Sequence, residues 1–213
     1  MTVGTSFAQA LSERIDGDVA ADGATLAAYS TDASNHRLVP ACVAFPRSVD
    51  DVAAIVAACR DEGVPVTSRG AGTNLAGNAI GSGVVVDYSR HLNRILTLDA
   101  ERRQAVVEPG VVLDRLQFRA AAAGLRFGPD PATHSRCTIG GMIGTNSCGA
   151  RSIAWGTTSA NVVALDLVLA DGSTTTLGRD RSSSLDPALK NLRDRWSAAI
   201  EQELGRFSRQ VSG

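Results

Sequence analysis

Two stretches of this sequence combine several glycines with small polar side chains, and both could bring the main chain close to a ligand. The first is RGAGTNLAG at residues 69–77, and the second is CTIGGMIGTNSCG at residues 137–149. In such stretches successive backbone N–H groups can turn toward one anion, whereas bulky side chains would hold the backbone away from it. Thr73 and Asn74 add polar groups to the first stretch. These residue types favour the binding of a phosphate or another anion.

The first loop fits neither of two common phosphate-binding patterns. A P-loop ends in Gly-Lys followed by Ser or Thr, and this loop has no such ending. The Rossmann pattern G-x-G-x-x-G needs a glycine where Leu75 stands and a helix directly afterwards, but the next apolar segment is a short strand at residues 84–86. We therefore expect a different fold. For this loop alone, a glycine-rich turn without a ligand stays an alternative.

The second stretch carries apolar residues for which a mobile surface loop would have no use. Ile139, Met142 and Ile143 are interleaved with its glycines, and the segment GPDP at residues 128–131 precedes it. The X-Pro bonds stiffen that segment because each proline restricts the residue before it. Two such loops in one small domain favour a long ligand with a phosphate centre and a planar end. FAD, bound in a fold other than the Rossmann fold, meets that description.

Hydrophobic periodicity predicts the elements that must position these loops. A buried strand at residues 42–45 and a strand at residues 64–67 flank a helix that Ser48 and Asp51 open as a capping box and that Gly63 ends. This order is a βαβ unit, whose strands are parallel. The other predicted elements are a helix at 5–16, a strand at 84–86, a hairpin at 95–98 and 105–107, a helix at 113–123, an irregular segment at 127–155, a hairpin at 162–169 and 174–177, and a helix opened by Asp186-Pro187 with Leu189, Leu192, Trp196 and Ile200 on one face.

Composition excludes several classes of protein. The 213 residues are 44% hydrophobic and 20% charged, which is ordinary for a globular chain. Lys plus Arg number 21 and Asp plus Glu 22, so the net charge of -1 lacks the basic excess of a nucleic-acid binder. Without a membrane-spanning run or a secretory signal we expect a cytoplasmic protein. We expect no metal site and no disulfides, with the cysteines as small buried hydrophobes: Cys42, Cys59, Cys137 and Cys148.

Residues 40–178 resemble the FAD-binding domain of the vanillyl-alcohol oxidase/p-cresol methylhydroxylase (PCMH) superfamily, with both loops in the same order. The run Thr138-Ile139-Gly140-Gly141, with Asn146, Cys148 and Gly149, is similar to the branch of FAD-linked D-2-hydroxy-acid dehydrogenases. That branch contains D-lactate, glycolate and D-2-hydroxyglutarate dehydrogenases. The segments YSTDAS (29–34) and GPDPATHSRCTIGG (128–141) resemble its large, iron–sulfur-containing members most.

The resemblance implies an α+β fold in which two α/β subdomains form a PCMH-type FAD-binding domain. An N-terminal helix and lead-in would cover residues 1–36, and the FAD-binding domain residues 37–205, with subdomains at about 37–97 and 98–205. In the resembled enzymes a C-terminal cap domain holds the substrate carboxylate and takes the hydroxyl proton. We expect this chain to lack the cap and to be an N-terminal fragment, with residues 206–213 as a truncated end.

The resemblance also assigns residues to the FAD site, position by position. Arg69, Gly70, Ala71, Gly72, Thr73, Asn74, Leu75, Ala76 and Gly77 match the pyrophosphate loop. The second, flavin-contacting segment is matched by Pro129, Asp130, Thr138, Gly140, Gly141, Asn146, Ser147 and Gly149. Positions near the adenosine end are matched by Trp155, Gly156, Asn161 and Val162. The resemblance gives no catalytic residue for this chain.

One departure from the family concerns how the flavin is held. Members with covalently bound flavin often carry a histidine where Thr73 stands, and threonine cannot form that bond, so we expect non-covalent FAD. His36 and His91 lie outside both loops in the sequence. His134 lies within the flavin segment, and its role stays open.

The activity implied by the resemblance is oxidation of a D-2-hydroxy acid to the 2-oxo acid, with hydride transfer to flavin. The electrons would then pass to an acceptor that the sequence does not identify. Three alternatives stay open. They are another flavoenzyme of the superfamily, such as an alcohol oxidase or a peptidoglycan-precursor reductase; a FAD-binding or electron-transfer module; and a truncated product without activity of its own.

Overall fold

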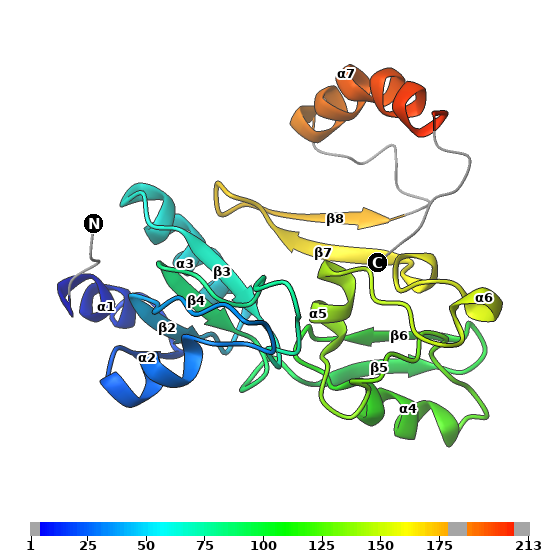
Figure 1. The fold of residues 1–213 in the computed structure, drawn as a ribbon, viewed down its shortest axis with the longest axis horizontal. Helices are drawn as coiled ribbons and strands as arrows, with labels where there is room; N and C mark the ends of the chain where they lie inside the picture. Colours follow the sequence, from blue (N-terminus) through cyan, green and yellow to red (C-terminus); the bar gives the residue numbers. More distant parts are fainter. Residues whose placement is uncertain (1–4, 179–186, 207–213) are drawn as a thin grey trace. The chain divides into compact units, whose positions relative to one another are not determined.

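The computed structural model describes residues 5–178 and 187–206 and has an α+β fold (Figure 1). The chain divides into two compact units, residues 1–161 with 168–173, and residues 162–167 with 174–213. In chain order the elements are α1 (Thr5–Ser12), β1 (Asp18–Ala20), α2 (Gly23–Tyr29), β2 (Cys42–Phe45), α3 (Val49–Asp61), β3 (Val66–Arg69), β4 (Val84–Asp87), β5 (Ile95–Asp99), β6 (Gln104–Val107), α4 (Leu113–Ala121), α5 (Ile139–Gly144), α6 (Ser152–Trp155), the 3-10 turn η1 (Ser159–Asn161), β7 (Ala164–Val168), β8 (Thr174–Gly178) and α7 (Pro187–Leu204).

The first unit contains a four-stranded sheet with the strand order β1-β2-β4-β3. Strand β1 is antiparallel to β2, while β2 and β3 are each parallel to β4. Cys42 of β2 and Val84 of β4 face a core shared with α1 and α3, whereas Val43 and Val85 face the other side, where residues of α2 pack. Because helices cover both faces, every residue of β2 and β4 is buried, without alternation, as is typical of buried parallel strands.

The predicted βαβ unit is confirmed, with one addition. The Ser48 hydroxyl accepts a hydrogen bond of 3.1 Å from the Asp51 N–H at the start of α3, and Gly63 follows the helix with φ of 64°. Strand β3 begins at Val66, later than the predicted start at residue 64. Strand β4 lies between β2 and β3, so the two strands of the unit are parallel but are not neighbours.

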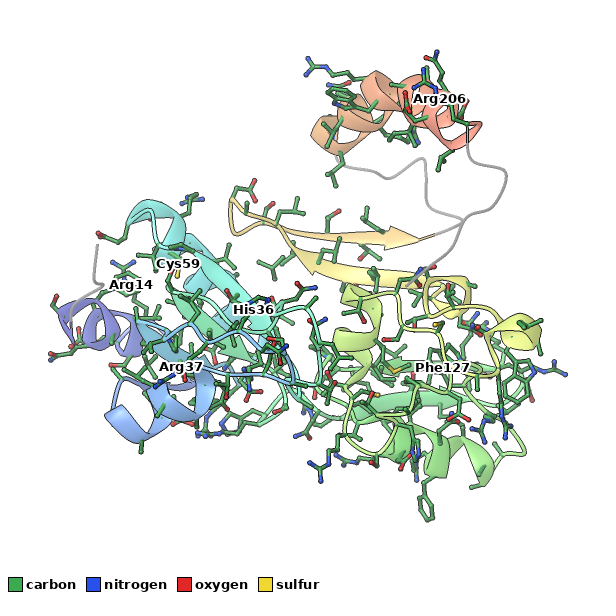
Figure 2. The ribbon with its side chains drawn as sticks, in the orientation of Figure 1. Arg14, His36, Arg37, Cys59, Phe127 and Arg206 are labelled. Carbon is green, nitrogen blue, oxygen red and sulfur yellow. The ribbon has the colours of Figure 1, made fainter. Side chains whose placement is uncertain are left out.

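The first unit also holds the antiparallel hairpin β5–β6 and the helices α4 and α5. Leu113 and Leu116 of α4 pack with Ile139 and Met142 of α5, and Phe127, labelled in Figure 2, packs against the same core. The expectation of an irregular segment at residues 127–155 was wrong in part, because α5 and α6 lie in it. The sequence also missed β1 and α2. Helices of six, four and seven residues and a strand of three are too short to show a period.

The second hairpin and the last helix were both predicted. Strands β7 and β8 form a two-stranded sheet, and the turn between them closes with a hydrogen bond of 2.8 Å from the Leu169 N–H to the Ser173 carbonyl. Helix α7 starts at Pro187; Asp186, its predicted cap, lies outside the described residues. Its apolar face is about half exposed at Leu192, Trp196, Ile200 and Leu204. None of the helices described is long and apolar enough to cross a membrane.

Candidate functional site

The first glycine-rich loop starts where β3 ends, at Arg69. The carboxyl ends of parallel strands are where open α/β sheets bind their ligands. The loop returns to the sheet at β4, the neighbour of β3. The topology therefore places the predicted pyrophosphate loop at a sheet edge suited to a ligand.

The main chain of this loop presents a row of N–H groups that have no acceptor among the described residues. The Asn74 side-chain oxygen accepts hydrogen bonds from the N–H groups of Ala76 (2.7 Å) and Asn78 (3.2 Å), so Asn74 shapes the loop from within. In the part of the chain that the structure describes, the other N–H groups have no acceptor: Gly70, Ala71, Gly72, Thr73, Asn74, Leu75 and Gly77. Neighbouring N–H groups that lack protein acceptors suit an anion.

Three glycines of the loop are required by close contacts or by backbone shape. A Cβ built on Gly70 would lie 2.0 Å from the Thr138 Oγ1 atom. Gly72 and Gly77 have φ of 68° and 77°, a region that other residues rarely adopt. Gly77 also lies against His36, labelled in Figure 2, whose Cδ2 would be 3.0 Å from an added Cβ. His36, outside the loop in sequence, is thus beside it in the structure.

The contact between Gly70 and Thr138 brings the two glycine-rich stretches together within the first unit. Thr138 is 2% exposed, and its hydroxyl accepts a hydrogen bond of 3.2 Å from the Gly141 N–H at the start of α5. The sequence treated the two stretches as separate loops that share one ligand. The structure shows that they share a packing contact as well.

The glycines of the second stretch pack mainly against the protein itself. An added Cβ on Gly140 would lie 2.7 Å from Pro109, and one on Gly149 would lie 2.3 Å from the Asp130 carbonyl oxygen. Both glycines are thus explained without a ligand. Gly141 is exposed and Pro129 is buried. Contacts between these residues and FAD stay a prediction.

Asn146 and Ser147 hold the next segment of the chain in place. Asn146 has φ of 47°, and its side-chain oxygen accepts a hydrogen bond of 2.9 Å from the Ser159 N–H. The Ser147 carbonyl accepts hydrogen bonds from the hydroxyl and the N–H of buried Thr158. The Ser147 hydroxyl lies 2.8 Å from that of Thr145. These hydrogen bonds tie Asn146 and Ser147, two predicted flavin contacts, to Thr158 and Ser159.

A small hollow of about 340 Å³ lies beside Trp155, lined also by Arg126, Gly128 and Asn161. The Asn161 side-chain N–H donates to the carbonyls of Trp155 and Thr157, next to Gly156 with φ of 75°. These are predicted adenosine-end residues, and the structure gathers them at one place. Val162, the last of that group, belongs to the second unit.

The Asp130 carboxylate is paired with two arginines near this hollow. It lies 2.9 Å from Arg126 and 3.5 Å from Arg151. Both guanidinium groups lie near the face of Trp155, at 5.8 and 5.2 Å from the ring centroid. The structure therefore gives Asp130 a role in neutralising arginines, and its contact with flavin stays a prediction. The His134 Nδ1 atom lies 2.7 Å from the Asp114 Oδ1 atom, so this histidine also has a partner within the protein.

The lead-in segment before β2 contributes contacts that sequence reasoning missed. The Ala33 N–H donates to the Gly72 carbonyl at 3.0 Å, and Asp32 accepts a hydrogen bond of 3.3 Å from the Ala79 N–H. Burial raises the pKa of Asp32, but hydrogen bonds from Ser34 and Ala79 and the charge of Arg69 bring it below its ordinary value. The YSTDAS motif was visible in the sequence, yet nothing in it showed that it reaches the loop.

The four cysteines are free thiols, as predicted. Cys42, Cys59 and Cys137 are buried, and Cys148 is half-buried. Burial raises the pKa of both Cys42 and Cys59 to about 11, which leaves these two thiols protonated at neutral pH. They act as small core residues.

Comparison with known proteins gives matches over most of the chain. A family model described as "FAD binding domain" matches residues 40–178. D-2-hydroxyglutarate dehydrogenase of Pantoea ananatis is 41% identical over 159 residues, which cover 73% of this chain and 16% of that protein. Glycolate oxidase subunit GlcD of Escherichia coli K12 is 33% identical over 184 residues, covering 84% of this chain and 37% of that subunit.

Solved structures with the same fold are larger too. 6-Hydroxy-D-nicotine oxidase from Arthrobacter nicotinovorans superposes with a TM-score of 0.69 at 27% identity, covering 79% of this chain and 37% of that one. An alkyldihydroxyacetonephosphate synthase superposes with a TM-score of 0.72 at 21% identity, covering 83% and 35%, which supports the fold alone. The chain spans about a sixth of the dehydrogenase and about a third of the other proteins.

Proposed function

This chain belongs to the family of FAD-binding domains, and on that premise we propose that it is the FAD-binding part of an oxidoreductase that converts a D-2-hydroxy acid to the 2-oxo acid. The substrate class is proposed from the names of the relatives, which include D-2-hydroxyglutarate dehydrogenases and glycolate oxidase subunits. The subdomain at 37–97 would supply the pyrophosphate loop, and the one at 98–205 the flavin-contacting segment.

The observation that carries the proposal is the row of N–H groups from Gly70 to Leu75, which have no acceptor among the described residues, in a loop whose Gly70 lies against Thr138. A diphosphate bridge carries two negative charges and many acceptor oxygens, so it suits donors that have no partner in the protein. The nearby loop residues are small, which lets the main chain approach a ligand. The residues present therefore fit FAD.

Each part of the site has its own role in this proposal. Bound FAD supplies the hydride acceptor for oxidation of the substrate carbon. The loop at residues 69–77 binds the diphosphate, and the segment at residues 138–149 borders the flavin. Thr73 offers only a hydroxyl, so we propose that the cofactor is held without a covalent bond. Groups that bind the substrate carboxylate and remove its hydroxyl proton would be contributed by a cap domain.

The test measures binding first and reduction second. The purified chain, freed of endogenous pigment, is titrated with FAD by calorimetry and flavin fluorescence, and acid treatment should release all of the bound flavin as FAD. Absence of binding by well-folded protein would refute the proposal.

Reduction distinguishes the proposed enzyme from the alternative of a FAD-binding or electron-transfer module. Because a cap domain is proposed to bind the substrate and remove its proton, this test uses a protein in which the chain is joined to a cap domain. Its FAD complex is mixed anaerobically with D-2-hydroxyglutarate, D-lactate, glycolate or L-2-hydroxyglutarate. Loss of flavin absorbance with a D-2-hydroxy acid or glycolate, and none with the L-isomer, is the expected result. A yellow protein that none of these substrates reduces would favour the module.

A further inference from the structure

The first glycine-rich loop is supported by a contact network on the side of Arg69 and of residues 31–33, which we call the strap. We propose that Arg69 is a positioning residue that fixes the peptide planes of this loop together with the strap, and that it does not itself bind the diphosphate. This inference rests on the proposed function and replaces the sequence-based expectation that Arg69 contacts the cofactor.

The guanidinium of Arg69 joins both sides of the network. Its Nη1 atom donates to the Thr31 carbonyl at 2.9 Å and to the Ala79 carbonyl at 3.0 Å. Its central carbon lies 4.9 Å from the ring centroid of Tyr29, which adds a cation–π contact. A Cβ on Gly72 would lie 2.6 Å from Nη2, so the loop passes directly over the guanidinium. A side chain at this position would have to displace the guanidinium, and the φ of 68° at Gly72 also favours glycine.

The strap adds two hydrogen bonds from the other direction. The Ala33 N–H donates to the Gly72 carbonyl, and the Asp32 carboxylate accepts from the Ala79 N–H. Ala79 is thereby held through both its carbonyl and its N–H. Its side chain is buried, so this end of the network is anchored in the protein.

These bonds determine which way the loop's dipoles point. In a trans peptide the C=O and the next N–H lie on opposite sides, and the described chain has no cis bond. Because the Gly72 carbonyl is bound to the strap, the Thr73 N–H points away from it. The strap thus binds the Gly72 carbonyl, which would repel an anion, and the Thr73 N–H on the opposite side of the peptide can donate to a ligand. Ordering the loop in advance lowers the entropy lost when a ligand binds.

The competing interpretation is a direct ion pair between Arg69 and the diphosphate. Nε and Nη2 of Arg69 have no acceptor among the described residues, so the two interpretations need an experiment. They predict opposite results for Asp32. If charge alone mattered, removal of this nearby carboxylate would strengthen binding of an anion. If the strap positions the loop, the same removal weakens binding.

The experiment compares Arg69→Met and Asp32→Ala in the full chain, with Arg102→Met and Asp61→Ala as controls of the same charge change on exposed side chains. Affinity for FAD should fall about tenfold or more in both variants, the value of one to two lost hydrogen bonds with charged groups. Affinity for riboflavin, which has no phosphate, should stay within about twofold. The controls should bind both ligands like the wild type.

Each other outcome has a defined meaning. Tighter or unchanged FAD binding by Asp32→Ala overturns the proposal, whatever Arg69→Met does. A matched loss of FAD and riboflavin affinity would mean general damage to the fold and would also overturn it. If circular dichroism shows that Arg69→Met does not fold, the direction of the change in Asp32→Ala decides alone. A wild-type chain that binds no FAD would instead refute the proposed function.

Discussion

At the scale of single residues, the site depends on close contacts that glycines allow because they have no Cβ atom. Gly70 allows the first loop to touch Thr138, and Gly72 allows it to cross the Arg69 guanidinium. The sequence pointed to these glycines as places where a ligand approaches the main chain. In the structure each also accommodates a protein group, so a substitution would disturb packing and ligand binding together.

Replacement of Gly70 by alanine tests this dual role. The added Cβ would lie 2.0 Å from the hydroxyl oxygen of Thr138, which is buried and caps α5, so neither group can move freely. We expect a loss of about 1–3 kcal/mol in the free energy of unfolding, the usual cost of overpacking, with weaker FAD binding. Urea denaturation and FAD titration measure both effects.

Gly23 provides the matched control because nothing lies within 4 Å of an added Cβ there. It is the first residue of α2, and Gly23→Ala should leave stability unchanged or raise it by up to about 1 kcal/mol. If Gly70→Ala were as stable as Gly23→Ala, the close contact with Thr138 would not exist in solution.

At the scale of elements, the sequence predicted the longer helices and the strands with concentrated apolar residues. The strand at Cys42–Phe45, helix α3 with its Ser48 cap, and both hairpins were found where expected. Helix α4 ends at Ala121, before the residue predicted, with Gly124 following at φ of 68°. The first glycine-rich loop was also found from composition, whereas the second stretch, expected as a loop, contains helix α5.

What the sequence could not supply was contact between distant segments. The strap meets the first loop through a main-chain hydrogen bond from Ala33 to Gly72, and the side chains of Arg69 and Asp32 bind backbone groups of Thr31 and Ala79. Each of these bonds has a main-chain partner, which leaves no pattern in side-chain types. The glycines packed on Pro109 and Asp130 look like ligand-facing glycines in the sequence for the same reason. The three-dimensional structure is needed to tell a glycine that packs against the protein from one that faces a ligand.

The start of the β5–β6 hairpin carries a pH-dependent contact. Glu108, 8% exposed, accepts hydrogen bonds from the Arg94 N–H at 2.6 Å, from Nε at 3.0 Å and from Nη2 at 2.6 Å. Burial raises the pKa of this carboxyl, but the bonds and charge of Arg94 outweigh it and hold the pKa below its ordinary value. The contact therefore stabilises the fold above the unfolded-state pKa of about 4.3 and loses that contribution as pH falls through the folded pKa.

Glu108→Gln should reveal this dependence. At pH 7 we expect it to lower the free energy of unfolding by about 1–2 kcal/mol, because the Arg94 side chain is largely exposed and the ion pair is partly screened. The difference from the wild type should shrink as pH falls below about 4. Denaturant unfolding at a series of pH values measures it, and a difference that stays constant down to pH 2.5 would show that Glu108 ionisation is not responsible.

At the scale of the whole molecule, the resemblance stated from the sequence is confirmed: the chain belongs to the FAD-binding domains and has their α+β fold. The structure adds that the predicted site residues lie in the first compact unit, apart from Val162 in the second. Helix α7, in the second unit, has an apolar face that is about half exposed. Because nearly all of the predicted site residues lie in the first unit, bound FAD should raise the free energy of unfolding of that unit.

The two tryptophans of the chain can report on the two units separately, since Trp155 lies in the first and Trp196 in the second. Trp196→Phe leaves a reporter in the first unit, and Trp155→Phe leaves one in the second. FAD binds the folded state only, so at a concentration of about 100 times Kd it should add about 2.7 kcal/mol to the stability of the unit that holds it. Thermal unfolding followed by tryptophan fluorescence should then show a higher midpoint for Trp155 and an unchanged one for Trp196. The Kd of each variant is measured by flavin fluorescence, and the FAD concentration is chosen from it. Equal shifts of both midpoints would mean that the two units unfold as one.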